Sequence, residues 1–528
     1  MRTTALFLAL LLCACGSDKK TDAAGGTVFV WGKSGDAVKL DPADVTDGES
    51  VMVITNIYDT LVAFQRGSTE LQPWLAESWE ASDDGKVWTF KLRKDVKFHD
   101  GSDFNADAVL FSFERQMDPN HPARRADSVF AYFQENFGSV SKIEKLDDFT
   151  VRFQLSQPVG FFDSMMAMFC VAIVSPTAFA SEGKDSDGRY RYDMATKPVG
   201  TGPFRFVSWK KDEYIKLKAN PDHFAGAPGV GTLILKPIKE PQPRLKELES
   251  GGLQGMDNPD LVDVVRLGES KNPRVVTSPG INVCYLAMNT LKKPFDNVKV
   301  RQAVAWAIDK NRLIEAAYAG IGEAAVSMCP ATMKGHLALE DRQPDIAKAK
   351  ALLAEAGFPN GFETTLWYPV IQRAYLPDSS ATAIQLAQDL RQIGIKVNLK
   401  KVEWAAYLEG TGNGVHDMCI LGWMADIGDP DNYLYVLLDK ENANPPGANN
   451  RSFYKGEEYS RLVTKARYTA NWDERVKLYA AAQRILFEEV PCVPLVTVPD
   501  FRVLQGDVRG YTIYPAGGEY FREVHFVK

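Results

Sequence analysis

The chain is poor in the residue types that bind metals. Among its 528 residues there are seven cysteines and six histidines. The histidines stand singly, and no cysteine spacing matches a zinc pattern or the C-x-x-C-H motif of covalently attached haem. The sequence therefore predicts neither a resident metal nor a cofactor.

An excess of positive charge is also missing. Lys and Arg total 61 against 68 Asp and Glu residues, which gives a formal net charge of -7. Because nucleic acid is held mainly through basic contacts to phosphates, we expect no nucleic-acid partner. Hydrophobic residues make up 45% of the chain, as in an ordinary folded protein. One core stops growing near about 250–300 residues, so this length predicts two or more lobes with a cleft between them.

The signatures of common enzyme classes are absent as well. A G-K-S segment begins at Gly32, but Thr27 stands where a phosphate-binding loop needs its first glycine. The G-T-G segments around Thr201 and Thr411 lack the third glycine of a dinucleotide site, and neither G-x-S-x-G nor H-E-x-x-H occurs. The sequence offers no positive evidence for catalysis, and we expect the protein not to be an enzyme.

The apolar run at the N-terminus is too short to span a bilayer. Residues 5–14 form a run of ten, whereas a membrane-spanning helix needs about 20. The run ends with a small residue before Cys15, which resembles the bacterial lipobox. This resemblance implies a lipoprotein signal peptide over 1–14, a lipid on Cys15 and a polar tether over 15–26. A plain secretory peptide is the alternative. We expect an exported, membrane-anchored protein, either periplasmic or at the cell surface.

Export places the cysteines in an oxidising compartment, where disulfides form. Five cysteines follow Cys15, and this odd, scattered set gives no disulfide framework. Cys284 and Cys419 each lie within a strand-like apolar run, which favours buried thiols over a bridge between the two strands.

Turn and capping residues predict several local elements. Asp84-Gly85 lies between two alternating segments and predicts a β-hairpin over residues 78–92. Asn105 precedes an amphipathic helix, and Asn471 with Glu474 resembles a capping box. Three further helices are expected to open at Asp296, Asp309 and Asp345.

The second half of the chain predicts a βαβ unit. Strands are expected near 362–370 and 397–404, and they should be parallel because a helix connects them. A third strand over 418–423 leads into the loop 424–432, where Asp429 and Asp431 are interpreted as turn and cap residues around Pro430. The connecting helix carries apolar residues at helical spacing, namely Ile384, Ala387, Leu390 and Ile393.

Short motifs spread over nearly the whole chain carry a family pattern. They are residues 75–79 (LAESW), 98–101 (FHDG), 105–109 (NADAV), 200–204 (GTGPF), 285–290 (YLAMNT), 300–303 (VRQA) and 347–353 (AKAKALL). Together they resemble the peptide- and nickel-binding class of ABC-transporter substrate-binding proteins, solute-binding protein family 5.

This resemblance implies an α/β fold: a two-lobed, periplasmic-binding-protein-like clamshell of type II, with an additional subdomain inserted in the first lobe. It places lobe I at 27–282 and 496–528, with the inserted subdomain at about 61–190, and lobe II at 283–495. Two strands near 282–289 and 493–498 are expected to cross between the lobes.

Two loops are most similar to the dipeptide-binding branch of that class. They are residues 371–375 (IQRAY) and 422–432 (GWMADIGDPDN). In that branch the arginine of Q-R-x-Y holds the ligand's C-terminal carboxylate, and the aspartate three residues after G-W holds its α-ammonium. By resemblance these residues are Arg373 and Asp426. Tyr375 and Trp423 are candidates for lining the pocket, with core packing as an equal alternative.

Elementary chemistry supports Arg373 and Asp426 as ligand-binding residues. Each follows the carboxyl end of a predicted strand, which is where ligands of open α/β sheets bind. A guanidinium offers a planar fork to a carboxylate, and a carboxylate suits an ammonium. The alternative is a pair of solvated loop charges.

The resemblance implies a monomeric receptor outside the cytoplasm. It would capture a short peptide, in particular a dipeptide, and deliver it to an ABC-type membrane permease with its ATPase subunits. Another cargo, such as an oligopeptide, glutathione, haem or a nickel complex, is the alternative within the same fold. An exported peptide hydrolase is the alternative from a different class.

Cys15→Ser tests the predicted anchor. The substitution removes the thiol that would carry lipid, so the variant should leave the membrane fraction or remain unprocessed. Ser17→Ala, the neighbouring control, should sediment with membranes like the unchanged chain. Fractionation and mass determination of the mature N-terminus measure both effects. An unmodified N-terminus at another residue would contradict the anchor.

Overall fold

The structure is a computed structural model and describes residues 26–125, 128, 130–516 and 518–527. The predicted signal peptide over 1–14 and the predicted lipidation at Cys15 lie outside the described residues. Within the described part of the chain, no helix has both the length and the apolar character needed to cross a membrane.

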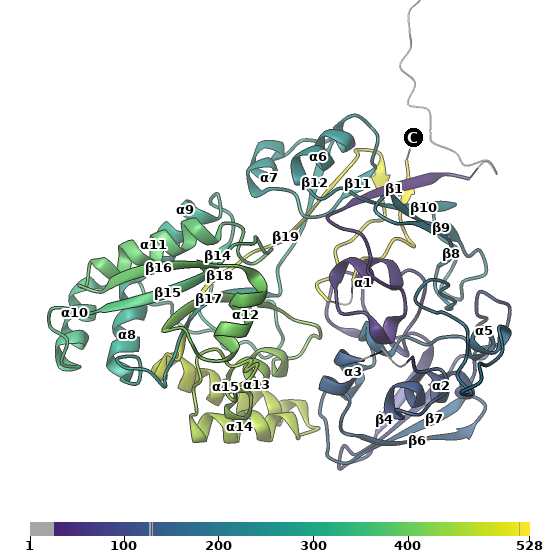
Figure 1. The fold of residues 1–528 in the computed structure, drawn as a ribbon, viewed down its shortest axis with the longest axis horizontal. Helices are drawn as coiled ribbons and strands as arrows, with labels where there is room; N and C mark the ends of the chain where they lie inside the picture. Colours follow the sequence, from purple (N-terminus) through teal and green to yellow (C-terminus); the bar gives the residue numbers. More distant parts are fainter. Residues whose placement is uncertain (1–25, 126–127, 129, 517, 528) are drawn as a thin grey trace, which may run out of the picture.

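Two separate β-sheets organise the molecule as two lobes (Figure 1). The sheet of the first lobe has the strand order β12-β19-β11-β1-β10-β9-β8, and that of the second has the order β14-β18-β13-β17-β15-β16. The first sheet contains β1 (Val28–Lys33), β8 (Phe204–Lys210), β9 (Tyr214–Ala219), β10 (Thr232–Pro237), β11 (Gly255–Met256), β12 (Arg274–Ser278) and β19 (Asp500–Leu504). The second contains β13 (Asn282–Met288), β14 (Glu323–Ala324), β15 (Glu363–Pro369), β16 (Lys396–Val402), β17 (Met418–Met424) and β18 (Cys492–Thr497).

Helices cover both sheets, because each sheet has apolar faces to bury. The first lobe carries η1 (Pro42–Asp44), α1 (Gly48–Ile54), α6 (Pro241–Glu249) and α7 (Leu261–Leu267). The second lobe carries α8 (Val298–Ala307), α9 (Lys310–Ala317), α10 (Ile346–Glu355), α11 (Ser379–Arg391), α12 (Trp404–Gly412), α13 (Asp431–Leu438), η3 (Lys440–Asn442), α14 (Glu457–Arg467) and α15 (Trp472–Glu489).

A third, smaller sheet with the order β4-β5-β7-β6 builds a subdomain beside the first lobe (Figure 1). Its own apolar core is rich in phenylalanine. The segments of this region are β2 (Val62–Phe64), β3 (Leu71–Pro73), β4 (Ala76–Ala81), β5 (Val87–Leu92), α2 (Ala106–Met117), α3 (Ala131–Asn136), β6 (Val140–Asp147), β7 (Thr150–Leu155), α4 (Phe162–Met165), η2 (Phe169–Val171) and α5 (Pro176–Ser181). Near the C-terminus, β20 (Val508–Arg509) pairs with β21 (His525–Phe526).

The chain passes between the two large sheets twice, at 279–281 and at 498–499. The Asn282 side chain ties these segments together, since its Nδ2 donates to the Val498 carbonyl (2.7 Å) and its Oδ1 accepts from the Val498 N–H (3.0 Å). A Cβ on Gly280 would stand 1.9 Å from the same carbonyl, so only glycine fits there. The two passages therefore form one narrow, hydrogen-bonded connection.

The local predictions agree well with the structure. The hairpin is confirmed, because β4 and β5 pair antiparallel. The βαβ unit is also confirmed, since β15 and β16 pair in parallel along their whole length. The side chains of Asn105, Asp309, Asp345 and Asn471 each cap the helix expected of them. All five described cysteines are free and buried, and the buried-thiol interpretation of Cys284 and Cys419 is thereby confirmed.

One detail of the sequence-based predictions is wrong. Asn297 rather than Asp296 caps α8, because its Oδ1 accepts from the Lys299 N–H (2.9 Å). On α11, Ile384 is 49% exposed. The helix turns a neighbouring face to the lobe, and the buried residues of that face are Thr382, Ala383, Leu386 and Leu390.

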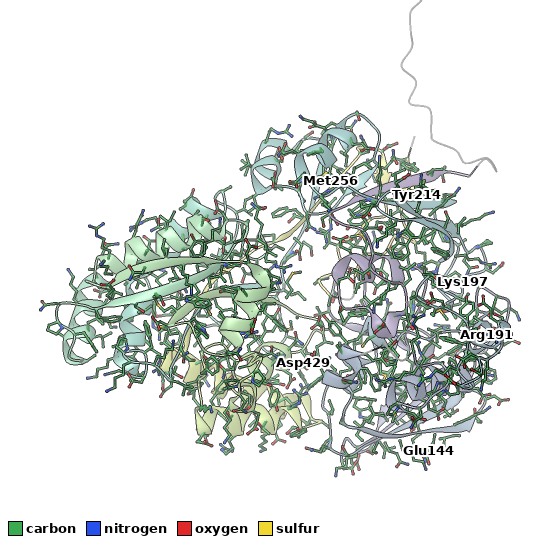
Figure 2. All side chains as sticks on the ribbon, in the orientation of Figure 1. Glu144, Arg191, Lys197, Tyr214, Met256 and Asp429 are labelled. Atoms are coloured by element: carbon green, nitrogen blue, oxygen red, sulfur yellow. The ribbon has the colours of Figure 1, made fainter. Side chains whose placement is uncertain are left out.

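The lobes also touch away from the two passages. Arg475 on α15 forms a buried ion pair with Asp429 (2.7 Å) and donates a second hydrogen bond to the carbonyl of Gly160 in the subdomain (3.1 Å). The Gly160 N–H in turn donates to the Arg467 carbonyl (3.2 Å). A Cβ on Gly160 would lie 2.0 Å from the Thr469 carbonyl, so the two backbones meet directly. Figure 2 shows Asp429 at this junction.

Removing one partner of the buried pair should be costly. The Arg475 and Asp429 side chains are 2% and 5% exposed, so Arg475→Met would leave a buried carboxylate without its cation. We expect the free energy of unfolding to fall by about 3–5 kcal/mol in a denaturant titration. The control is Arg461→Met, which breaks a pair whose partners are both 60% exposed and should cost about 0–1 kcal/mol. Equal losses in the two variants would contradict this assignment.

Candidate ligand-binding site

Arg373 and Asp426 lie at the same edge of the second lobe's sheet. β15 and β17 are parallel neighbours, with Leu366 opposite Met418. Arg373 follows the carboxyl end of β15, and Asp426 follows that of β17. This is the edge where open α/β sheets bind their ligands.

The Arg373 side chain packs against an aromatic ring, and its backbone is part of a fixed turn. Its Cζ lies 4.2 Å from the ring centre of Trp404 on α12, which is a cation–π contact. A tight turn fixes its backbone, because Arg373 and Leu376 exchange two N–H to carbonyl hydrogen bonds (3.1 and 2.8 Å). The Nε of Arg373 is buried and has no hydrogen-bond partner among the described residues. An oxyanion ligand would satisfy this donor.

Tyr375 packs mostly into the core of the second lobe. It is 9% exposed, and its ring lies so close to Gly422 that a Cβ there would stand 2.2 Å from the tyrosine Cδ2. The glycine before Trp423 therefore makes room for this ring. Burial raises the pKa of Tyr375 to about 12, and the positive charge of Arg373 opposes this shift. Tyr375 thus anchors the Arg373 turn to the apolar core of the second lobe.

Asn432, which the sequence analysis did not single out, organises the loop that carries Asp426. Its Oδ1 accepts hydrogen bonds from the Trp423 indole N–H (2.8 Å) and from the Asp426 backbone N–H (3.2 Å). Trp423 is half-buried, and its polar edge is used within the loop. One amide at the start of α13 thus fixes both predicted residues of this loop.

The Asp426 carboxyl group is half-buried and faces the first lobe. Burial raises its pKa to about 6, the negative charge of Glu135 on α3 adds to the shift, and the Asn432 side chain opposes it. The pKa values of Tyr132 on α3 and Cys170 on η2 are raised mainly by burial. The negative charge of Asp426 is the second cause of both shifts. Asp426 forms no ion pair among the described residues. Its carboxylate would therefore be available to pair with a ligand cation.

The neighbours of Asp426 in the chain pack against residues of the first lobe and of its subdomain. Ala425 belongs to an apolar cluster that includes Phe64 and Ala167, and Ile427 belongs to the core of the subdomain. A Cβ on Gly428 would lie 2.5 Å from the Thr69 Cβ. A ligand at Asp426 would therefore contact both lobes.

The described residues contain no cluster of three or more His, Cys, Asp or Glu side chains that could hold a metal ion. The functional groups near Arg373 and Asp426 are a guanidinium, a carboxylate, aromatic rings and backbone. Such a set can bind a ligand that carries charges of both signs.

Comparison with known proteins identifies the family. Residues 70–445 match the model for bacterial extracellular solute-binding proteins, family 5. The chain belongs to this family. It is 36% identical to heme-binding protein A of Haemophilus influenzae over 535 residues, covering 97% of this chain and 96% of that protein. It is also 36% identical to a dipeptide-binding protein of Pseudomonas aeruginosa over 506 residues, covering 93% of each chain.

A solved family structure has the same two-lobed α/β fold. It is the ABC transporter-associated periplasmic binding protein DppA from Helicobacter pylori in complex with the peptide STSA, with a TM-score of 0.80 and 37% identity. The match covers 95% of this chain and 98% of that one. The predicted family and clamshell fold are thereby confirmed.

The raised pKa of Asp426 predicts a pH-dependent stability difference. Between about pH 4 and 6 the folded chain binds more protons at Asp426 than the unfolded chain, so stability falls as pH rises through this window. Asp426→Asn removes that loss and should raise the free energy of unfolding by about 1–2 kcal/mol at pH 7.5, less at pH 4.5. Thermal melts at both pH values measure it, with exposed Asp187→Asn as the control. A variant less stable at pH 7.5 would contradict the assignment.

Proposed function

We propose that this family-5 protein is an extracytoplasmic receptor for short peptides, dipeptides in particular. It would present them to an ABC-type permease and its ATPase subunits. The observation that carries the proposal is the placement of Arg373 and Asp426 after two adjacent parallel strands. Neither side chain has an ion-pair partner among the described residues, and the Nε of Arg373 has no hydrogen-bond partner there. The names of the Pseudomonas dipeptide-binding relative and of the peptide-bound Helicobacter structure support it.

Two fixed opposite charges select for ligand length. Consecutive Cα atoms are about 3.8 Å apart, so each added residue moves one terminus by about 3.3–3.6 Å relative to the other. In the proposed complex, Arg373 binds the peptide carboxylate and Asp426 its α-ammonium. Tyr375 and Trp423 support these two residues, and side chains of the peptide extend into the space between the lobes.

The remaining features of the proposal follow from the sequence. The protein would act as a monomeric receptor and not as an enzyme, and it would be attached to the membrane through lipid on Cys15. Residues 27–282 and 496–528 would form lobe I, with the subdomain at about 61–190, and residues 283–495 lobe II. The passages between the sheets at 279–281 and 498–499 lie within a few residues of these boundaries. The narrow connection at Asn282 and Val498 is a suitable hinge, since a ligand between the lobes needs them to open.

Haem is a second candidate because a relative with 36% identity is named for binding it. Haem brings two carboxylates and no ammonium. Arg373 suits such a ligand, but Asp426 would then face no cation and its burial would go uncompensated. A zwitterionic peptide uses both residues, so the peptide is favoured.

Removing either charge should weaken dipeptide binding strongly. If ligand binding buries both contacts, Arg373→Met or Asp426→Asn leaves a ligand charge unpaired, at a cost of roughly 3–5 kcal/mol. This corresponds to roughly a 10²–10⁴-fold loss of affinity in isothermal titration calorimetry. N-acetylated and C-terminally amidated dipeptides should lose a similar factor with the unchanged protein.

The matched control is Arg391→Met at the exposed end of α11, which should bind dipeptides like the unchanged protein. Chromatography of the ligand after incubation distinguishes a receptor from a hydrolase, because a receptor returns the dipeptide intact. Release of amino acids would support the hydrolase. Wild-type affinity in Arg373→Met would remove the dipeptide assignment and leave the family-level receptor.

A further inference from the structure

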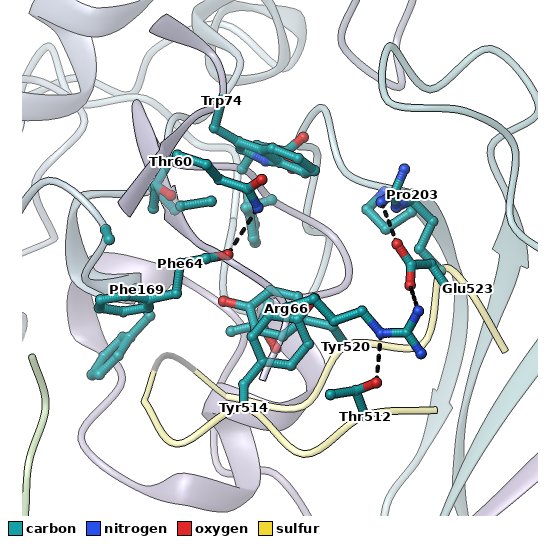
Figure 3. A pocket seen from close by; sticks show the side chains of 18 of the residues that line it. Thr60, Phe64, Arg66, Trp74, Phe169, Pro203, Thr512, Tyr514, Tyr520 and Glu523 are labelled. Atoms are coloured by element: carbon teal, nitrogen blue, oxygen red, sulfur yellow. Dashed lines mark hydrogen bonds and ion pairs between the residues drawn. The ribbon is translucent and has the colours of Figure 1, made fainter. Parts of the chain in front are cut away.

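The first lobe contains a cavity of about 160 Å³, shown in Figure 3. Four parts of the chain line it: residues from 54–74, which include the β2–β3 hairpin, residues around η2, Pro203, and C-terminal residues from 510–514 and 520–523. Several aromatic side chains line it, among them Phe64, Trp74, Phe169, Tyr514 and Tyr520.

Polar groups in the cavity wall are already bonded to protein. The two carboxylate oxygens of Asp59 accept from the Trp74 indole N–H (2.6 Å) and the Thr201 hydroxyl (2.7 Å). Arg66 pairs with Glu523 (2.9 Å) and donates from its Nε to the Thr512 hydroxyl (2.5 Å). An occupant therefore meets mainly aromatic and aliphatic surface, with an ion pair at an exposed part of the wall.

The cavity lies beside the loop that carries Asp426. Phe169 of the cavity wall packs against the Tyr132 ring at 4.9 Å, and Asp426 is close enough to Tyr132 to raise its pKa after the effect of burial. The β2–β3 hairpin that forms another wall contacts this loop where Thr69 meets Gly428. The ring contact and the backbone contact thus place the cavity in the neighbourhood of the loop that carries the proposed ammonium-binding residue.

We propose that this cavity binds the side chain of the peptide's N-terminal residue and selects large apolar side chains, aromatic ones above all. The inference rests on the proposed function. In a peptide, the α-ammonium and the first side chain are attached to the same Cα. A ligand whose ammonium is held by Asp426 therefore directs its first side chain toward the neighbouring cavity, whereas its second residue lies toward Arg373.

The size of the cavity fits this assignment. An apolar cavity of about 150 Å³ in another protein binds a benzene ring. The present cavity, at about 160 Å³, has room for a phenylalanine side chain. Ring stacking and edge contacts with the surrounding aromatic residues add to the gain from burial.

The test compares three dipeptides by titration calorimetry. The unchanged protein should bind Phe-Ala about 10- to 100-fold more tightly than Ala-Ala, as expected for burial of a large apolar side chain, and Ala-Phe should gain much less. Ala63→Phe fills the cavity from β2 and should abolish the preference for Phe-Ala while Ala-Ala binding is kept. The control is Ala180→Phe, which adds the same ring at an exposed site of α5 and should keep the preference.

The outcomes separate the inference from the function on which it rests. Equal affinity of the unchanged protein for Phe-Ala and Ala-Ala, or a larger gain for Ala-Phe, overturns the inference and leaves the dipeptide receptor intact. Absence of binding to all three peptides overturns the proposed function and the inference with it. The comparison of ligands uses the unchanged protein, so it decides the matter even where Ala63→Phe does not fold.

Discussion

The buried ion pair between Asp429 and Arg475 constrains the loop that carries Asp426, the proposed ammonium-binding residue. Both partners are almost inaccessible to water, so neither can be left without the other. Arg475 also holds the Gly160 carbonyl of the subdomain. The segment between Trp423 and α13 is consequently tied to its own lobe and to the opposite one at the same point. Asp426 lies inside this segment, three residues before the ion pair.

Hydrogen bonds and apolar packing together hold that short segment in place. Asn432 binds the Trp423 indole and the Asp426 backbone, while Ala425 and Ile427 join apolar clusters that extend into the first lobe. Because of these contacts, Asp426 has little freedom to move toward solvent. Its carboxyl group therefore stays in a half-buried position, where burial raises its pKa to about 6. The geometry that positions the carboxylate also makes it costly to ionise.

The sequence predicted features that depend on neighbours in the chain. The caps at Asn105 and Asp345, the hairpin turn at Gly85 and the parallel βαβ unit follow from local rules, and the structure contains them. Asp429 and its turn were foreseen, but its partner Arg475 is 46 residues away and no local rule connects them. Likewise, the contact of Trp404 with Arg373 depends on how α12 returns over the sheet. The cavity is lined by four separate parts of the chain, so only tertiary packing reveals it.

The two predicted binding residues differ in how the protein prepares them. Arg373 is stabilised in place by an aromatic face, and a guanidinium keeps its charge whether or not a ligand is present. Asp426 has no cationic partner among the described residues, and burial disfavours its charged form. In the free protein, the cost of burying a charge therefore lies mainly at Asp426, which faces the first lobe. If a ligand ammonium binds there, as proposed, it would relieve this cost most when both lobes enclose the site, because water then no longer competes for the carboxylate. In the proposed complex the closed form would gain more from the ligand than the open form, and that difference in affinity would drive closure.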